Sequence, residues 1–234
     1  MEFKNFSYLL LLLGYLVIPV ILGYQRKVRF AFRLRYLIPA TIFAGAIFVM
    51  WDRRFIEMDI WSFNPGYTSG IQWLKVPVEE WLSFIVIPWS AVYIYEWLKI
   101  RFENFEKPRL FVIISLIGFA ALAFLAYTFR QHMFSFFTFF LSAIYLGYTV
   151  FRNRFRKNLT KFYLAYFVSL LPFTILSGIA SRLEIVNYNP QHTMNINLAD
   201  FPVEKFAYLF LLLLINITIY EYLSERRYFL DFKL

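Results

Sequence analysis

The amino-acid sequence predicts an all-α, polytopic membrane protein with about seven transmembrane helices, arranged as two parallel repeats of three helices around one linker helix. The first observation is composition: 60% of the 234 residues are hydrophobic and 17% are charged, whereas a soluble domain is about one half apolar and one quarter charged. The second is a series of long apolar segments. The third is a set of motifs that recurs after 125 residues.

Seven apolar segments account for the expected helices, since a helix needs about 20 residues to cross a bilayer. The first follows a single basic residue, Lys4, and lacks a small-residue cleavage site, so it is interpreted as a retained helix and not as a signal peptide. The second is the shortest and the weakest. The segments span residues 6–24, 36–51, 78–98, 110–129, 133–151, 162–180 and 203–223.

The chain is expected to be one membrane domain, residues 1–234, because no stretch rich in Gly, Ser or Pro divides it. A shift of 125 positions predicts repeats over about 1–105 and 130–234, joined by a linker helix at 110–129. A single linker helix keeps both repeats in the same orientation, so their axis should run along the membrane normal. The shift aligns Asn64-Pro65 with Asn189-Pro190, Pro77-Val78-Glu79 with Pro202-Val203-Glu204, and Tyr95-Glu96 with Tyr220-Glu221.

Basic residues are distributed unequally between the two expected faces. Of the 24 Lys and Arg residues, 17 fall in connections on one face and six on the other. Because cytoplasmic loops carry the excess of Lys and Arg, we expect an N-terminus outside and a C-terminus in the cytoplasm, in the cell (inner) membrane. The net charge of +9 is therefore attributed to these loops and to contact with membrane lipid, and no nucleic-acid partner is expected.

Several kinds of chemistry lack their residues. The chain has no Cys, which excludes disulfides, thiolate nucleophiles and Cys-bound clusters. It has no G-x-G sequence, so it shows no dinucleotide-binding fingerprint. Its two His residues, His132 and His192, are far apart and lack the spacing of zinc ligands. We expect no cofactor and no metal site.

Carboxylates at two helix starts are the strongest candidates for catalysis: Glu79 and Glu80 in the first repeat and Glu204 in the second. One interpretation is structural, because Pro and Glu are favourable in the first turn of any helix. The motif is, however, duplicated in register, and ionisable groups at membrane depth are costly and usually functional. If Glu79 and Glu204 face each other in a dry interior, one should hold a proton, so that one acts as acid and the other as base.

A wider set of residues is expected to bind the substrate. The rings of Trp81, Phe84 and Tyr208 can stabilise a carbocation through their faces, although ordinary helix packing explains such aromatics equally well. Asp52 can join the site or simply end its helix, and Asn216 can bind substrate or hydrogen-bond to another helix. The repeated Asn64 and Asn189 complete the set.

Two further carboxylates, Glu96 and Glu221, lie 17 residues beyond the first pair. This separation corresponds to about 25 Å along a helix, on the other side of the membrane. We expect these two residues to pair with the basic cytoplasmic loops.

The motifs FNPGYTSG, PVEEW and YEW, followed one repeat later by YNP, PVEKFAY and INITIYEY, resemble those of the integral-membrane lycopene cyclases, here in the fused form that covers both halves. The resemblance implies redox-neutral cyclisation of the linear ends of lycopene, without the flavin fold of soluble-type cyclases. It implies Glu79, Glu80 and Glu204 as the motif carboxylates, an apolar C40 polyene drawn from the bilayer as substrate, and carotenoid-pathway enzymes as further partners.

One position departs from the family pattern, because Lys205 stands where an acidic residue usually follows the second Pro-x-Glu. It can pair with its repeat equivalent, Glu80, or indicate altered ring selectivity or loss of lycopene cyclisation. The expected activity is that of a lycopene β-cyclase, an isomerase type of enzyme, in which a protonated Glu79 or Glu204 starts ring closure. A small-solute transporter with repeated helices and a membrane prenyltransferase, whose diphosphate site would use Asp52, Glu57 and Asp59, are the alternatives.

Overall fold

The computed structural model describes residues 3–17 and 30–231. Seven α-helices lie in this part of the chain, and six of them are long and apolar enough to cross a membrane. The prediction of an all-α, polytopic membrane protein is confirmed. The helices are α1 (Ser7–Tyr15), α3 (Phe30–Glu57), α4 (Val78–Arg101), α5 (Pro108–Thr128), α6 (Met133–Phe151), α7 (Leu159–Arg182) and α8 (Glu204–Asp231).

Two predicted spans differ from the observed helices. The span expected at 6–24 overlaps α1, and its residues 18–24 lie outside the described residues. The span expected at 36–51 is the middle of α3, which has 28 residues. This helix continues beyond its apolar segment because charges pair along it: Arg53 Nε lies 3.2 Å from Glu57 Oε1, one turn away. Asp52 therefore lies inside a helix and does not end it.

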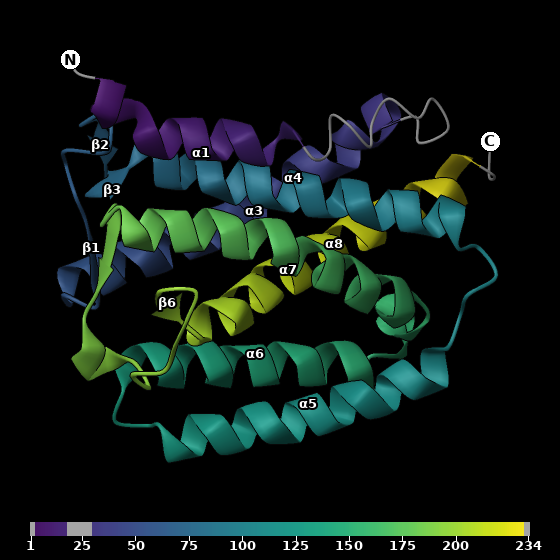
Figure 1. The fold of residues 1–234 in the computed structure, drawn as a ribbon. Coiled ribbons are helices and arrows are strands. Elements are labelled where there is room, and N and C mark those ends of the chain that lie inside the picture. The colour runs from purple at the N-terminus through teal and green to yellow at the C-terminus, as the bar shows by residue number, and fades with distance from the viewer. Residues whose placement is uncertain (1–2, 18–29, 232–234) are drawn as a thin grey trace.

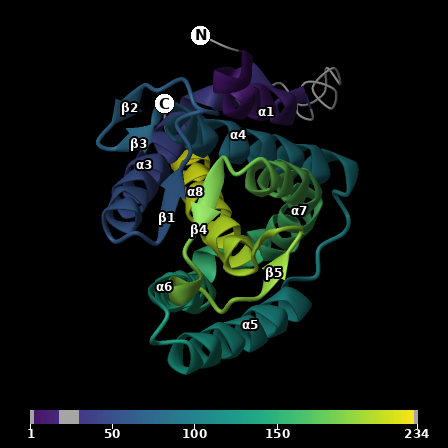
Figure 2. The ribbon, with the colours of Figure 1, turned by 60° about the vertical axis from the view of Figure 1, so that its left-hand side comes forward.

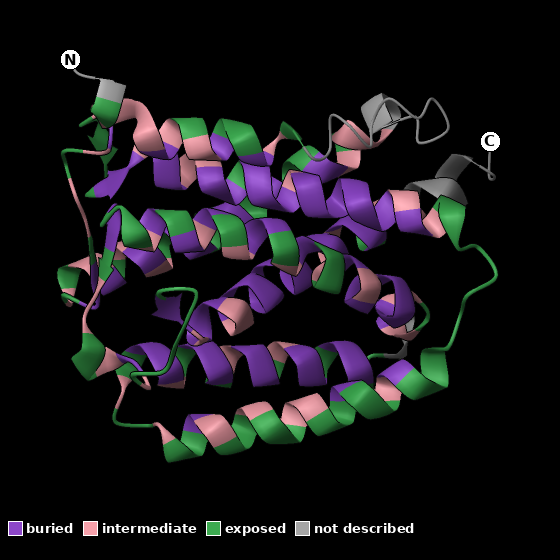
Figure 3. Cartoon of the chain, in the orientation of Figure 1, coloured by how far each residue is buried: buried purple, intermediate pink, exposed green. Residues whose placement is uncertain are grey.

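The helices form one bundle with α8 near its centre, packed against α3, α4, α6 and α7 (Figure 2). The linker helix α5 lies at the edge of the bundle and packs mainly on α6 (Figure 1). Figure 3 shows the contrast in burial, with α4 and α8 largely buried and α5 largely exposed. The exposed face of α5 carries Ile117 and Phe124, as a lipid-facing helix requires because apolar side chains match the bilayer interior.

The strands are short and gather at the end of the bundle where α4 and α8 begin (Figure 1). β1 pairs with β4 antiparallel, and Ser62 faces Asn187, its equivalent under the 125-residue shift. The pairing extends reciprocally: Asn64 N–H donates to Ile185 O at 3.0 Å, and Asn189 N–H donates to Ile60 O at 2.9 Å. A local two-fold axis thus passes between the two strands. The strands are β1 (Trp61–Phe63), β2 (Gln72–Trp73), β3 (Val76–Pro77), β4 (Val186–Tyr188), β5 (Asn197–Leu198) and β6 (Phe201–Pro202).

Two small hairpins, β2–β3 and β5–β6, deliver the chain to α4 and α8. Each turns through two residues of positive φ, Leu74 and Lys75 in the first and Ala199 and Asp200 in the second. Positive φ at both central positions is the geometry of a type I′ turn. The φ angles of 54° and 67° recur as 52° and 69° one repeat later, so the backbone repeats even where the side chains differ.

Candidate active site

The two hairpins place a proline immediately before each carboxylate motif. Pro77 ends β3 and occupies the N-cap of α4, one position earlier than the first helical residue. Pro202 ends β6 two residues before α8 begins. Backbone N–H groups at a helix start have no acceptor within the helix, so a proline there loses no hydrogen bond. The two prolines are therefore tolerated directly before the helix starts that carry Glu79 and Glu204.

Glu79 and Glu204 each bind a loop of their own repeat. Glu79 Oε1 accepts the Ser69 N–H at 2.6 Å, and Glu204 Oε1 accepts the Met194 N–H at 2.6 Å. Glu204 Oε1 also accepts the Ser135 hydroxyl at 2.5 Å. Both side chains are at most 2% exposed, and the Oε2 atom of each has no hydrogen-bond partner among the described residues. The two carboxylates therefore hold equivalent loops against equivalent helix starts.

The predicted Asn64 and Asn189 shape these same loops. Asn64 Oδ1 accepts the Gly66 N–H and Asn189 Oδ1 accepts the Gln191 N–H, both at 3.0 Å. Such bonds close the short turns that Asn favours. Neither Asn lines the pocket described next.

A small pocket of about 40 Å³ lies between α4, α7 and α8, beneath the strands. Among the described residues Glu80 is the carboxyl in its lining, and Lys205, at the position equivalent to Glu80, also lines it. Phe84 and Ser83 of α4, Tyr208 of α8 and Tyr8 of α1 also line it. Trp81 lies outside, where it stacks on Trp73 with ring centroids 4.5 Å apart.

Glu80 belongs to a buried pair of carboxyl groups. Its Oε2 accepts the Tyr8 hydroxyl, and its charge acts on Asp52. Asp52 is 0% exposed, and its Oδ1 accepts the Tyr208 hydroxyl at 2.5 Å. Each of the two carboxyl groups therefore accepts a hydrogen bond from a buried tyrosine hydroxyl.

Lys205 supplies the charge that balances this pair. Its Nζ lies 4.6 Å from the centroid of Trp61, 4.9 Å from that of Tyr208 and 5.5 Å from that of Tyr188. The charges of Glu80 and Asp52 both act on it. Burial raises the pKa of the Tyr188 phenol, so this ring stays neutral beside the ammonium. An ammonium beside two buried carboxyl groups offsets part of the cost of placing their negative charge in a dry interior.

The remaining predicted residues lie elsewhere in the bundle. Asn216 is buried, and its Nδ2 donates to Thr41 Oγ1 at 3.4 Å between α8 and α3. Of the loose acidic cluster, Asp52 lies outside the pocket lining and binds Tyr208, whereas Glu57 binds Arg53, Arg54 and Lys75 at 3.2–3.7 Å. No group of three His, Asp or Glu side chains in the described ranges is placed to hold a metal.

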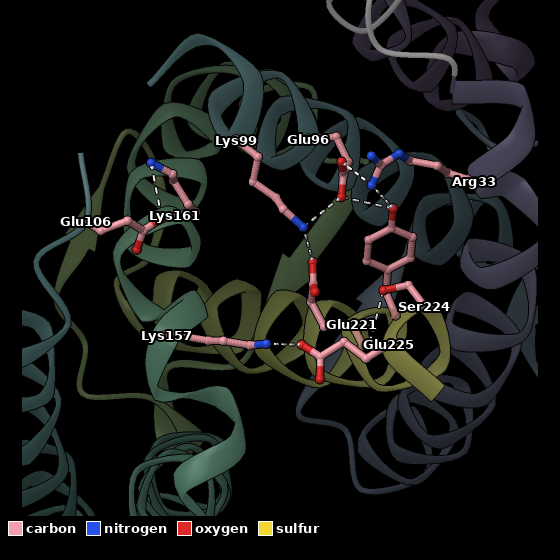
Figure 4. Close-up of polar contacts among 10 residues, drawn as sticks. Arg33, Glu96, Lys99, Glu106, Lys157, Lys161, Glu221, Ser224 and Glu225 are labelled. Atoms are coloured by element: carbon pink, nitrogen blue, oxygen red, sulfur yellow. Dashed lines mark hydrogen bonds and ion pairs between the residues drawn. The ribbon is translucent and has the colours of Figure 1, made fainter. Parts of the chain in front are cut away.

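Glu96 and Glu221 form a second buried cluster at the opposite end of α4 and α8 (Figure 4). Lys99 Nζ lies 2.7 Å from Glu221 Oε1 and 3.4 Å from Glu96 Oε1. Glu96 also pairs with Arg33 and accepts the Tyr220 hydroxyl at 3.0 Å. These carboxylates have cationic partners at their own end of the bundle, so they cross-link α3, α4 and α8 there.

The pocket contains residues that sequence reasoning did not select. Tyr8 lies in an apolar segment whose other residues resemble any transmembrane helix, and no motif marks it. Tyr188 begins the YNP motif, so its place in the repeat could have identified it. Lys205 is a departure from a family pattern, whereas its place over the rings of Trp61, Tyr188 and Tyr208 depends on how the strands and helices pack.

Comparison with known proteins identifies the family of the chain. The family model described as Lycopene cyclase matches residues 5–98 and again residues 131–223, which together form most of the chain. Neither a curated protein nor a solved structure matches it. The two matched segments contain both helix starts, both hairpins and the pocket between them. The chain therefore belongs to the lycopene cyclase family.

Proposed function

We propose that the protein is a lycopene β-cyclase in which Glu80 transfers the proton. Family membership makes it an enzyme of carotenoid cyclisation that acts on an apolar carotenoid. The observation that carries the finer assignment is the position of Glu80, a carboxyl that lines the pocket, accepts the Tyr8 hydroxyl and lies close enough to the buried Asp52 for their charges to interact. A protonated carboxylic acid held next to aromatic rings is suited to start a cationic ring closure.

The reaction proceeds without change of oxidation state. Glu80 donates its proton to C2 of the terminal C1=C2 double bond, which leaves a cation at C1. The C5=C6 electron pair attacks C1, so the ring closes and the positive charge moves to C5. The Glu80 carboxylate then takes the proton from C6, which forms the C5=C6 double bond of a β ring and regenerates the acid.

The surroundings assist each stage. The rings of Phe84 and Tyr208 line the pocket and can stabilise the cation through their faces. The charge of Asp52 acts on Glu80 from outside the lining, and the Lys205 ammonium compensates negative charge on the two carboxyl groups. With one carboxyl in the lining, deprotonation is expected to give the β ring, whose double bond is conjugated with the chain.

Glu79 and Glu204 stay as the alternative acid–base pair predicted from the motifs. Each carboxylate is occupied by a loop N–H, and neither lines the pocket. This arrangement supports a positioning role for both. We also propose, from the distribution of Lys and Arg, that the strand-bearing end of the bundle faces the outer side of the cell membrane.

The test is expression in bacteria that accumulate lycopene, with chromatography of the extracted pigments. The wild-type chain should yield carotenoids with β rings, and Glu80→Gln should leave lycopene unchanged at equal expression. Glu103→Gln, at an exposed position, is the matched control and should retain activity. Unchanged lycopene with well-folded wild-type protein would defeat the proposal, and full activity in Glu80→Gln would remove Glu80 from the mechanism.

A further inference from the structure

The pocket lies where the pseudo-two-fold axis passes between α4 and α8, yet its surroundings are not symmetric. α4 and α8 contribute equivalent positions, among them Glu80 with Lys205 and Ser83 with Tyr208. On the flank, α7 contributes Leu176, Ser177 and Ala180 to the lining. Their equivalents in α3 are the larger Trp51, Asp52 and Phe55.

Aromatic side chains fill the flank on the α3 side. Trp51 lies 5.5 Å from Tyr208 and 5.4 Å from Phe55 between ring centroids, and Phe48 lies 4.9 Å from Tyr208. Protein interiors are close-packed, so the large rings on this flank leave the open volume on the α7 side, where the corresponding residues are smaller.

A larger apolar groove of about 370 Å³ adjoins the pocket on this α7 side. It lies between α1 and α7, which pack against each other, and Leu176 lines both the groove and the pocket. Its rim is open to the bilayer: Leu171 is 70% exposed and Ile175 is 56% exposed. The groove therefore lies between the lipid-facing surface and the pocket that contains Glu80, with the side chain of Leu176 at the boundary.

Gly14 of α1 keeps this groove open. A Cβ built at Gly14 would meet no atom within 4 Å, so a side chain there would project into free space. The equivalent position in α6 is Phe139, which is buried. The two repeats thus differ at the positions that decide whether a groove exists: Gly14 and Leu176 on the open side correspond to Phe139 and Trp51 on the filled side.

We propose that the α1–α7 groove binds the linear polyene chain of the substrate while its end group enters the pocket. The pocket alone is far smaller than the ~300–1,000 Å³ of typical ligand sites, so most of a C40 chain must lie outside it. The groove is apolar, shares Leu176 with the pocket and has exposed apolar side chains at its rim, which matches a polyene without polar groups. This inference rests on the proposed cyclase function. It implies that the polyene enters by one route and that one of its two ends reacts at a time.

Two substitutions that copy the filled side test the groove: Gly14→Phe and Leu176→Trp. With protein in lipid nanodiscs, kinetics are measured with lycopene and with an apo-lycopenal, a truncated polyene that retains one linear end group. Gly14→Phe should raise KM for lycopene about tenfold or more with kcat within about twofold, because it blocks the chain and not the proton donor. The truncated substrate should be affected much less, and Gly14→Leu should be intermediate.

Two further measurements separate the outcomes. Ile117→Phe, at an exposed position of α5, controls for an added lipid-facing ring and should behave as the wild type. Lycopene binding, followed by quenching of tryptophan fluorescence, should weaken in Gly14→Phe whether or not rings form. Unchanged binding and KM in a folded Gly14→Phe protein, or equal losses for long and truncated substrates, would overturn the groove assignment. Binding that depends on Gly14 without ring formation would instead refute the cyclase function and leave the groove assignment in place.

Discussion

Replacing Glu79 with Gln distinguishes a residue that positions a loop from one that transfers a proton. Glu79 Oε1 accepts the Ser69 N–H at 2.6 Å, and the side chain is 2% exposed. Gln retains an acceptor oxygen of the same size at this place but can neither carry the negative charge nor donate a carboxylic proton. Glu79→Ala removes the acceptor as well.

The expected magnitudes differ for the two roles. A hydrogen bond to a charged group contributes about 1.5–3 kcal/mol and a neutral one about 0.5–1.5 kcal/mol. Glu79→Gln should therefore weaken the bond to the Ser69 N–H by about 1–1.5 kcal/mol. This energy corresponds to a loss of correctly positioned loop, and hence of rate, of about tenfold at most. Glu79→Ala leaves a buried N–H unsatisfied and should cost about 1–3 kcal/mol more. A residue that transfers the proton would instead contribute about 10²–10⁴-fold to the rate.

The assay compares initial rates of ring formation with thermal unfolding of the same preparations. We expect Glu79→Gln to retain at least about one tenth of the rate, with a lower unfolding temperature, and Glu79→Ala to lose more of both. Glu103→Gln is the control for loss of a carboxylate. A rate loss of more than about 100-fold in Glu79→Gln at an unchanged unfolding temperature would refute the positioning role and return Glu79 to the acid–base pair.

Four further predictions follow from the buried charges and the single carboxyl-lined pocket. Lys205→Met should lower the initial rate at least about tenfold, because it leaves two buried carboxyl groups without a compensating cation, whereas Lys205→Arg should retain more activity. Lys99→Met should destabilise the fold by about 2–3 kcal/mol, allowing for the exposed third of its side chain, and lower the unfolding temperature with kcat unchanged. Asn216→Leu should alter stability by less than about 1 kcal/mol and leave KM unchanged; a raised KM would indicate a role in substrate binding. Time courses should show monocyclic product before bicyclic product, and simultaneous appearance would argue against one reacting end at a time.

Much of the fold follows from local sequence. Apolar segments of bilayer length must form helices, because no water is present to satisfy an open backbone. The span at 36–51 was underestimated because hydropathy ends at Trp51, whereas the helix continues through paired charges to Glu57. The motif prolines and glutamates correctly marked the starts of α4 and α8, since a helix start tolerates proline and favours acidic side chains.

The sequence by itself determined that this chain is a multi-pass helical membrane protein and that carboxylates begin two equivalent helices, because both properties are set by composition and by spacing along the chain. Only the tertiary structure decided which carboxyl meets the pocket. Glu79 and Glu80 are adjacent in sequence, but successive residues of a helix point in different directions, so one contacts a loop and the other the interior. Tyr8 donates to Glu80, and the charges of Asp52 and Lys205 interact with it. These three residues come from three other helices, and packing alone brings them near Glu80.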